Sequence, residues 1–265
     1  MDLKNAVCIV TGSASGIGAA SAVMLAARGA RVVVNYSKSE TAARATLKAC
    51  EAAGALFGGE TLLVKADVAE DADCRRLARS ALDKWGRIDA LVNNAGATKF
   101  ANHADLEALS AEDFQRIYAV NVVGAYQMVR ACAAAMKQGG RGAVVNVSSI
   151  AGKNGMGSSM AYAASKGALN TLTLSLARWF GPAVRVNTVC PGFIQTRWLL
   201  GALGQENYEK LREAQEQTTP LRQAGTPEQM AEAVIFFLTS ASNITGEFLI
   251  VDAGTHLGGL PMKGR

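Results

Sequence analysis

Short apolar runs alternate with segments of helical spacing along almost the whole chain, and this alternation limits the possible folds more than any other feature. The runs lack the regular polar positions of a strand that has one face in water, which is typical of a parallel sheet covered on both sides. The runs are AVCIV (6–10), ARVVVN (30–35), TLLVKAD (61–67), RIDALVNNAG (87–96), GAVVNVSS (142–149), AVRVNTVCPG (183–192) and EFLIVDAG (247–254). We therefore predict an α/β fold in a single domain over 1–265, with a doubly wound parallel sheet and helices on both faces.

Residues 193–225 interrupt this rhythm as a long insertion. It contains the amphipathic piece ENYEKLREAQEQ (206–217) and ends before Thr226 and Pro227, which mark a helix start by a cap and a first-turn proline. Another helix start is SAED (110–113), a capping-box pattern. An insertion of this length in a compact domain is usually a lid or a binding segment, so we expect it to build the substrate pocket.

Composition excludes several classes of protein. With 49% hydrophobic and 18% charged residues, the chain is globular and not disordered. It has neither an apolar stretch of about 20 residues nor an export signal, so we expect a cytoplasmic protein without a membrane partner. The net charge of +5 is dispersed, which argues against a nucleic-acid partner. Five scattered cysteines without a C-x-x-C pair predict neither a disulfide framework nor a metal site.

A glycine-rich turn, TGSASGIG (11–18), joins the first predicted strand to the first helix. Gly12 would allow a tight turn, Gly16 would let the backbone approach a pyrophosphate, and Gly18 would permit close packing of the helix. The helix N-terminus would offer its free N–H groups to the anion. The spacing is G-x-x-x-G-x-G, so the turn predicts a dinucleotide site, with an ordinary structural turn as the alternative.

The end of the second strand indicates which dinucleotide binds. A ribose 2′-hydroxyl is normally held there by an acidic side chain, which would repel a 2′-phosphate. Here Asn35 ends the strand, Ser37 and Lys38 follow, and no acid appears before Glu40. This pattern favours NADP(H) without excluding NAD(H). A solvated loop lysine is the alternative interpretation of Lys38.

Ser149, Tyr162 and Lys166 form a candidate proton-transfer site. Tyr162 and Lys166 lie one helical turn apart, and Ser149 ends a strand at the sheet edge where ligands bind. The pKa of a tyrosine is ordinarily near 10, about three pKa units above neutral. An ammonium about 4 Å away contributes up to about 4 kcal/mol at an effective dielectric of about 20. We therefore expect Lys166 to bring the pKa of Tyr162 close to neutral.

Several motifs occur in one order along the chain: TGSASGIG (11–18), NNAG (93–96), Asn121, Ser149, Tyr162, Lys166 and PGFIQT (191–196). Together they resemble the short-chain dehydrogenase/reductase family across nearly the whole chain. The resemblance implies a Rossmann-type domain, a nicotinamide cofactor, a small carbonyl or alcohol substrate, and a homotetramer or homodimer. The VVVNYS strand, the GEFLIVDAG tail and the overall length are most similar to the 3-oxoacyl-carrier-protein reductase type.

The resemblance also implies a role for each motif residue. Tyr162 would transfer the proton, Lys166 would lower its pKa and hold the nicotinamide ribose, and Ser149 would orient the carbonyl or hydroxyl. Asn121 would hold a water that relays protons through Lys166, although an asparagine at a helix kink fits the same position. The implied cofactor-binding residues are Gly12, Ser13, Ser15, Gly16, Ile17, Gly18, Asn35, Ser37, Lys38, Asp67 and Val68 (at the adenine), Asn94, Ala95, Gly96, Tyr162, Lys166, Pro191, Gly192, Ile194 and Thr196.

Two positions qualify these implications. Many NADP-dependent members of the family carry Arg or Lys just before the second glycine of the loop, where this chain has Ser15. Asn35, Ser37 and Lys38 would therefore bind the phosphate alone. Cys190 is expected to be a packing cysteine, because no base accompanies it in the sequence.

The start of the insertion is apolar, with Trp198, Leu199, Leu200 and Leu203. These side chains predict a substrate wall, with core or subunit-interface packing as the alternative. The sequence thus predicts an NADP(H)-dependent oxidoreductase that interconverts a carbonyl and a secondary alcohol, such as a 3-oxoacyl-thioester reductase. The alternatives are an NAD-dependent sugar, polyol or steroid alcohol dehydrogenase, and a dinucleotide-binding sensor without catalysis.

Overall fold

A parallel sheet of seven strands forms the centre of the computed structural model, which describes residues 1–258. The strand order is β3-β2-β1-β4-β5-β6-β7, and every neighbouring pair is parallel. The strands are β1 (Val7–Val10), β2 (Arg31–Tyr36), β3 (Thr61–Lys65), β4 (Ala90–Asn93), β5 (Gly142–Val147), β6 (Val184–Pro191) and β7 (Phe248–Val251). The order reverses between β1 and β4, which confirms the predicted doubly wound sheet and locates its switch point.

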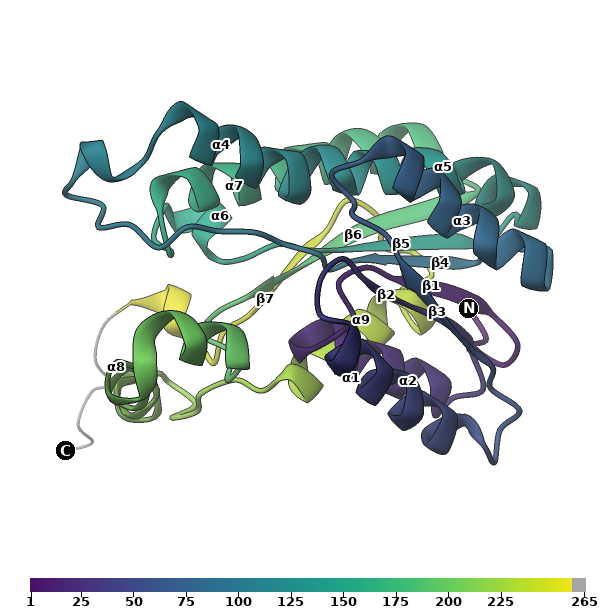
Figure 1. The fold of residues 1–265 in the computed structure, drawn as a ribbon, viewed down its shortest axis with the longest axis horizontal. Coiled ribbons are helices and arrows are strands. Elements are labelled where there is room, and N and C mark those ends of the chain that lie inside the picture. Colours follow the sequence, from purple (N-terminus) through teal and green to yellow (C-terminus); the bar gives the residue numbers. More distant parts are fainter. Residues whose placement is uncertain (259–265) are drawn as a thin grey trace.

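Helices cover both faces of the sheet (Figure 1). One face carries α1 (Gly16–Ala26), α2 (Glu40–Gly54) and α9 (Pro227–Thr239). The other carries α3 (Asp71–Trp85), α4 (Ala111–Tyr118), α5 (Ala125–Gly139), α6 (Ala151–Asn154) and α7 (Met160–Phe180). None of the helices within 1–258 combines the length and the apolar character that a bilayer crossing requires.

The apolar residues of the strands contribute to two hydrophobic cores, one on each face of the sheet. Along β1, Cys8 and Val10 face the core beneath α1, α2 and α9, while Val7 and Ile9 face the core beneath α3 and α5. All four residues are fully buried. Successive strand residues point to opposite faces, so a strand that is buried on both sides needs apolar residues throughout. This is why the runs showed no polar alternation.

Side-chain caps fix the helix starts that frame the site. The predicted capping boxes at Ser110 and Thr226 are both present. Ser159 caps α7 by accepting from the N–H of Tyr162, so the cap lies against the candidate catalytic tyrosine. Between α4 and α5 the backbone forms a π-helical segment, Ala119–Gly124, which places Asn121 in a local distortion of the helix.

The insertion at 193–225 is dominated by α8 (Arg197–Thr218), which lies apart from the two helical layers in Figure 1. Thr196 caps it by accepting from the N–H of Leu199. Gly204 breaks the helix with φ 72° and ψ 163°, so α8 consists of two helical pieces joined by a kink. None of its residues is buried, in contrast to every other long helix.

Candidate functional site

A cavity of about 1430 Å³ opens at the carboxyl ends of the strands on both sides of the switch point. Most of the predicted site residues line it: Gly12, Ser15, Gly16, Ile17, Asn35, Ser37, Lys38, Asp67, Val68, Asn94, Ala95, Gly96, Ser149, Tyr162, Lys166, Pro191, Gly192, Ile194 and Thr196. Ser13, Gly18 and Asn121 do not line it. Segments far apart in the sequence therefore converge on one cavity, in the place where open α/β sheets bind ligands.

The glycine loop lies against the loop that follows β4. Gly12 has φ 61°, and a Cβ there would lie 2.8 Å from the Cα of Ala95. Gly16 has φ 56°, and a Cβ there would lie 3.4 Å from Cγ2 of Thr196. The Asn94 amide donates to the carbonyls of Thr11 and Gly12, both at 3.0 Å. The glycines thus form a cradle of bare backbone at the start of α1, and this cradle fits the pyrophosphate of a dinucleotide.

Two predicted cofactor residues face the protein interior, which corrects their expected role. The Asn35 amide donates to the carbonyl of Ala66 at 3.0 Å, and its Oδ1 accepts from the N–H of Gly12 at 3.0 Å. The Ser13 hydroxyl donates to the carbonyl of Val10 at 2.7 Å. Both side chains are buried. They hold the loop in shape, and the hydrogen bonds of Asn35 within the protein leave Ser37 and Lys38 as the side chains that extend from this strand end into the rim.

Gly18 does not line the cavity but packs against residues that do. A Cβ at this position would lie 2.7 Å from the carbonyl oxygen of Gly12 and against the amide of Asn94. Close packing of the helix was expected at Gly18, and the neighbours there are the glycine loop and the end of β4.

Ser37 and Lys38 are exposed at the cavity rim, where the 2′-phosphate was expected. The nearby Glu40 is engaged elsewhere, because Arg44 approaches its carboxylate to 2.7 Å. Hydrogen bonds from Arg44 and Tyr36 lower the pKa of Glu40. Among residues 1–258, this part of the rim therefore offers the Lys38 ammonium and the Ser37 hydroxyl, while Glu40 is already paired.

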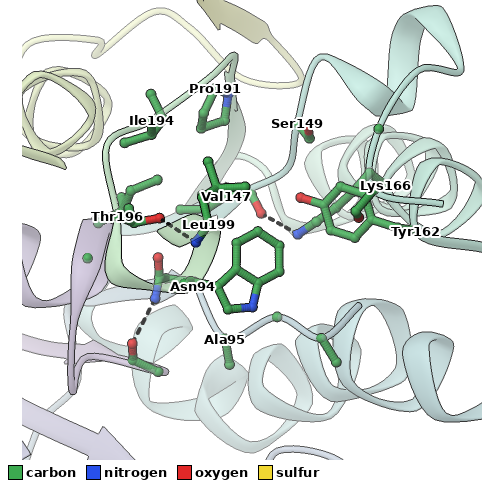
Figure 2. Close-up of a pocket in the computed structure, with 18 of the residues that line it drawn as sticks. Asn94, Ala95, Val147, Ser149, Tyr162, Lys166, Pro191, Ile194, Thr196 and Leu199 are labelled. Atoms are coloured by element: carbon green, nitrogen blue, oxygen red, sulfur yellow. Dashed lines mark hydrogen bonds between the residues drawn. The ribbon is translucent and has the colours of Figure 1, made fainter. Parts of the chain in front are cut away.

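The predicted proton-transfer residues meet on one wall of the cavity. Figure 2 shows Tyr162 and Lys166 beside Ser149, opposite Asn94 and Thr196. The Lys166 Nζ lies 5.6 Å from the Tyr162 ring centroid and donates to the carbonyl of Val147 at 2.9 Å. The Lys166 side chain is 3% exposed, whereas Tyr162 and Ser149 are only partly buried and reach the cavity.

The expected lowering of the tyrosine pKa by Lys166 is wrong in this structure. Burial raises the pKa of Tyr162 to about 12, although a hydrogen bond with Ser149 acts in the opposite direction. Burial also lowers the pKa of Lys166 to about 8. Desolvation opposes both charged forms, and the Lys166 ammonium is directed at a backbone carbonyl, so it does not offset the loss of hydration. Tyr162 is therefore neutral at physiological pH.

Asn121 connects the catalytic helix to the loop after β4. Its Oδ1 accepts from the N–H of Ala97 at 2.7 Å, and its Nδ2 donates to Ser165 Oγ at 2.9 Å. Ser165 in turn donates to the carbonyl of Tyr162 at 2.7 Å. The side chain thus holds the backbone around Tyr162 from within the π-helical segment. These contacts fit the kink interpretation that the sequence left open.

The first half of α8 forms part of the cavity wall. Trp198, Leu199 and Leu203 line it as predicted, whereas Leu200 does not. Sequence reasoning missed a further group of lining residues: Phe100, Arg116, Met156, Leu211 and Gln215. Signals were available for some of them, because Phe100 lies close after the NNAG motif and Leu211 lies on the apolar side of the amphipathic piece. Cys190 is buried, and desolvation raises its pKa to about 11, as befits a packing cysteine.

Comparison with known families and proteins agrees with this geometry. A family model described as enoyl-(acyl carrier protein) reductase matches residues 12–256. Ketoacyl reductase 2 of the granaticin polyketide synthase of Streptomyces violaceoruber is 46% identical over 251 residues, covering 95% of this chain and 96% of the relative. A 3-oxoacyl-[acyl-carrier-protein] reductase of Synechocystis is 37% identical, covering 94% and 96%.

Other relatives act on different alcohols. An L-rhamnose 1-dehydrogenase (NAD(P)(+)) of Sphingomonas is 35% identical, covering 96% of this chain and 98% of the relative. Among solved structures, a short-chain dehydrogenase/reductase of Burkholderia xenovorans is similar with a TM-score of 0.87 and 40% identity, covering 96% and 99% of the two chains. The relatives thus share a reaction class but differ in their substrates.

Proposed function

Because this chain belongs to the short-chain dehydrogenase/reductase family of oxidoreductases, we propose that it is an NADP(H)-dependent enzyme that reduces a ketone to a secondary alcohol. The observation that carries the proposal is the convergence of Ser149, Tyr162 and Lys166 on the cavity that also contains the glycine cradle. When bound there, the cofactor supplies or accepts a hydride. The residues of the chain must therefore hold the substrate oxygen and move a proton.

Tyr162 and Ser149 are suited to that task. Both hydroxyls reach the cavity from adjacent positions, so a carbonyl oxygen between them can accept two hydrogen bonds. As the alcohol forms, Tyr162 gives its proton to this oxygen, and the buried Lys166 lies close enough to stabilise the resulting phenolate. A neutral tyrosine is the form that donates a proton, and burial keeps Tyr162 in this form until the proton is transferred.

The substrate class that we propose is a 3-oxoacyl thioester or a ketone of similar polarity. The names of two relatives, a polyketide ketoacyl reductase and a 3-oxoacyl-[acyl-carrier-protein] reductase, support this class. The apolar cavity wall formed by Trp198, Leu199 and Leu203 also supports it.

Replacement of Tyr162 by Phe tests the proposal directly. With NADPH and acetoacetyl-CoA as probes, we expect the nicotinamide absorbance to fall with the wild type and the turnover of Tyr162→Phe to be lower by at least about 100-fold. The Kd for NADPH should stay unchanged. Tyr126→Phe is the matched control, because Tyr126 is exposed on α5 and does not line the cavity. Full activity of Tyr162→Phe would reject the mechanism.

Replacement of Lys38 by Ala tests the choice of cofactor. If Lys38 pairs with the 2′-phosphate, its loss should weaken NADPH binding by about tenfold and leave NADH binding unchanged. Lys48→Ala is the control, since Lys48 is exposed on α2 and lies outside the cavity lining. Tighter binding of NADH than of NADPH by the wild type would instead favour an NAD-dependent dehydrogenase.

A further inference from the structure

Three aromatic rings form a continuous wall beside the proton-transfer site. Trp198, on the first turn of α8, has its ring centroid 5.9 Å from that of Phe100 and 6.2 Å from that of Tyr162. The rings are tilted by 58° and 47° in these two pairs. Both distances fall within the range in which aromatic pairs attract each other beyond simple burial. The catalytic phenol is therefore one member of an aromatic cluster, here called the aromatic wall (Phe100, Tyr162 and Trp198).

The aromatic wall leaves much of its surface open to the cavity. Trp198 is 47% exposed and Phe100 is 37% exposed, and both line the cavity. Large aromatic side chains in folded proteins normally bury most of their area, so open rings that face a cavity are suited to covering a ligand. The apolar surface continues over Met156, Leu199, Leu203 and Leu211.

Charged groups are scarce at this end of the cavity. Among the described residues that line it, the charged side chains are Lys38, Asp67, Arg116 and Lys166. Lys38 and Asp67 lie after β2 and β3, on the nucleotide side, and Lys166 is engaged with Val147. Arg116 pairs with Asp113 at 3.2 Å. Within the part of the chain that the structure describes, no carboxylate thus lies beside Tyr162 to bind the hydroxyls of a sugar or polyol.

The neutral polar groups nearby are engaged as well. Ser158 shares a hydrogen bond of 2.6 Å with Thr98, and Gln215 accepts from Thr255 at 3.3 Å. The Asn102 oxygen accepts from the N–H of Ala104 at 3.0 Å. The region therefore offers aromatic and aliphatic surface, with the hydrogen-bonding groups of Ser149 and Tyr162 at its base.

We propose that Trp198 is a specificity-determining residue that selects ketones whose carbonyl group adjoins a planar aromatic or conjugated ring. This inference rests on the proposed carbonyl reduction and adds a preference for the group that adjoins the carbonyl. A planar ring seated on Trp198 gains the aromatic contact in addition to burial, whereas a saturated ring of the same size gains only burial. Reduction needs the carbonyl oxygen at Tyr162, and Trp198 contacts the Tyr162 ring, so a ring adjoining the carbonyl reaches Trp198.

The test compares two ketones of nearly equal size, 1-tetralone with an aromatic ring and 1-decalone with saturated rings, each with NADPH. Because conjugation with the ring makes 1-tetralone intrinsically less electrophilic, the quantity to compare between variants is the ratio of kcat/KM for 1-tetralone to kcat/KM for 1-decalone. We expect Trp198→Ala to lower this ratio about three- to tenfold through a higher KM for 1-tetralone, which corresponds to the usual worth of an aromatic contact. Trp198→Phe should retain the wild-type ratio. Trp179→Ala is the control, because Trp179 is 78% exposed on α7 and does not line the cavity.

An equal loss of kcat/KM for both ketones in Trp198→Ala, which leaves their ratio unchanged, would overturn the inference while leaving carbonyl reduction intact. Calorimetric binding of both ketones to Tyr162→Phe provides a second measurement that needs no turnover. Tighter binding of 1-tetralone that disappears when Trp198→Ala is added would support the inference even if the wild type reduced neither ketone. Selective binding of 1-tetralone without reduction by the wild type would reject the proposed function alone. Equal binding of both ketones would reject the inference.

Discussion

The glycine loop and α8 line the same cavity but are held by the protein in opposite ways. The loop is fixed by buried side chains: Asn35 holds Gly12 from one side, and Asn94 holds it from the other. By contrast, α8 has no buried residue, and its course is interrupted at Gly204. One region is thus determined by many internal hydrogen bonds, and the other lies on the surface of the molecule.

This difference matches the two tasks of the cavity. NAD and NADP share the same pyrophosphate and nicotinamide, so a site built from backbone and buried amides serves either nucleotide well. Substrates differ among the relatives, from ketoacyl groups to L-rhamnose, according to their names. A surface helix can change its side chains without disturbing either core, since none of its residues belongs to one. We infer that the two regions respond to mutation independently.

The largest expected effect is that of Gly18→Ala in the loop region. The new Cβ would lie 2.7 Å from the carbonyl oxygen of Gly12 and against Asn94, and neither can move without breaking the hydrogen bond between them. We expect the free energy of unfolding to fall by about 3 kcal/mol and NADPH binding to weaken by about 100-fold or more. Urea denaturation and fluorescence titration with NADPH measure the two effects.

Gly139→Ala is the matched control for Gly18→Ala. Gly139 ends α5, and the nearest atom to a Cβ there is Asp89 Oδ1 at 4.0 Å. Alanine should be tolerated at this position because helices favour it over glycine. A Gly18→Ala protein that bound NADPH normally would show that the loop is less constrained than its contacts indicate.

The sequence predicts the loop region well because its constraints are local. Gly12, Gly16 and Gly18 lie within seven residues of one another, and the i+4 spacing alone places Tyr162 and Lys166 on one helix face. The parallel sheet buried on both faces follows from apolar runs that have no polar face. These features need no knowledge of how distant segments pack.

Side-chain direction was less predictable than position. Asn35 lies at the cavity, yet its amide is turned toward the carbonyl of Ala66, and only the pairing of β2 with β3 brings these residues together. Likewise, the pKa of Tyr162 depends on burial by the whole fold, which outweighs the neighbouring Lys166 that the sequence displays. The kink at Gly204 could not be inferred, since glycine is also found within regular helices.

The pH dependence of stability at Lys166 tests whether α7, the helix that carries this lysine, is held as firmly as the glycine loop. The pKa of Lys166 is lowered from 10.5 to about 8 by burial, so between these values the unfolded chain carries a proton that the folded chain lacks. Raising the pH across this window therefore stabilises the folded state. Between about pH 7.5 and about pH 9.5, the wild type should gain about 2 kcal/mol of unfolding free energy relative to Lys166→Met.

Comparison with the variant is necessary because other groups titrate at high pH. Four buried cysteines, Cys8, Cys50, Cys74 and Cys132, form thiolates more readily in the unfolded chain and destabilise both proteins alike above about pH 9. Cys190 interacts electrostatically with Lys166, so the difference in urea unfolding between wild type and Lys166→Met reports the lysine together with this one thiol. If this difference did not change with pH, Lys166 would be hydrated. In that case α7 would be loosely held near Lys166, as α8 is, and would not share the constraint of the glycine loop.

The smallest effect is expected in α8 itself, where two glycines allow a matched comparison. A Cβ at either Gly201 or Gly204 meets no atom within 4 Å, so neither alanine variant creates a clash. Only Gly204 has a positive φ, which alanine adopts at a cost of about 1 kcal/mol or more. Gly204→Ala should therefore lose about that much unfolding free energy, whereas Gly201→Ala should be neutral or slightly stabilised.

The kinetic effect of Gly204→Ala shows whether the glycine loop and α8 respond to mutation independently. If the kink only sets the direction of the half of α8 that carries Trp198 and Leu203, the variant should raise KM for the ketone about threefold. Its Kd for NADPH should match that of the wild type, because none of the contacts that hold the glycine loop involves α8. A Kd that rose together with KM would mean that α8 also orders the nucleotide side, through the approach of Thr196 to Gly16.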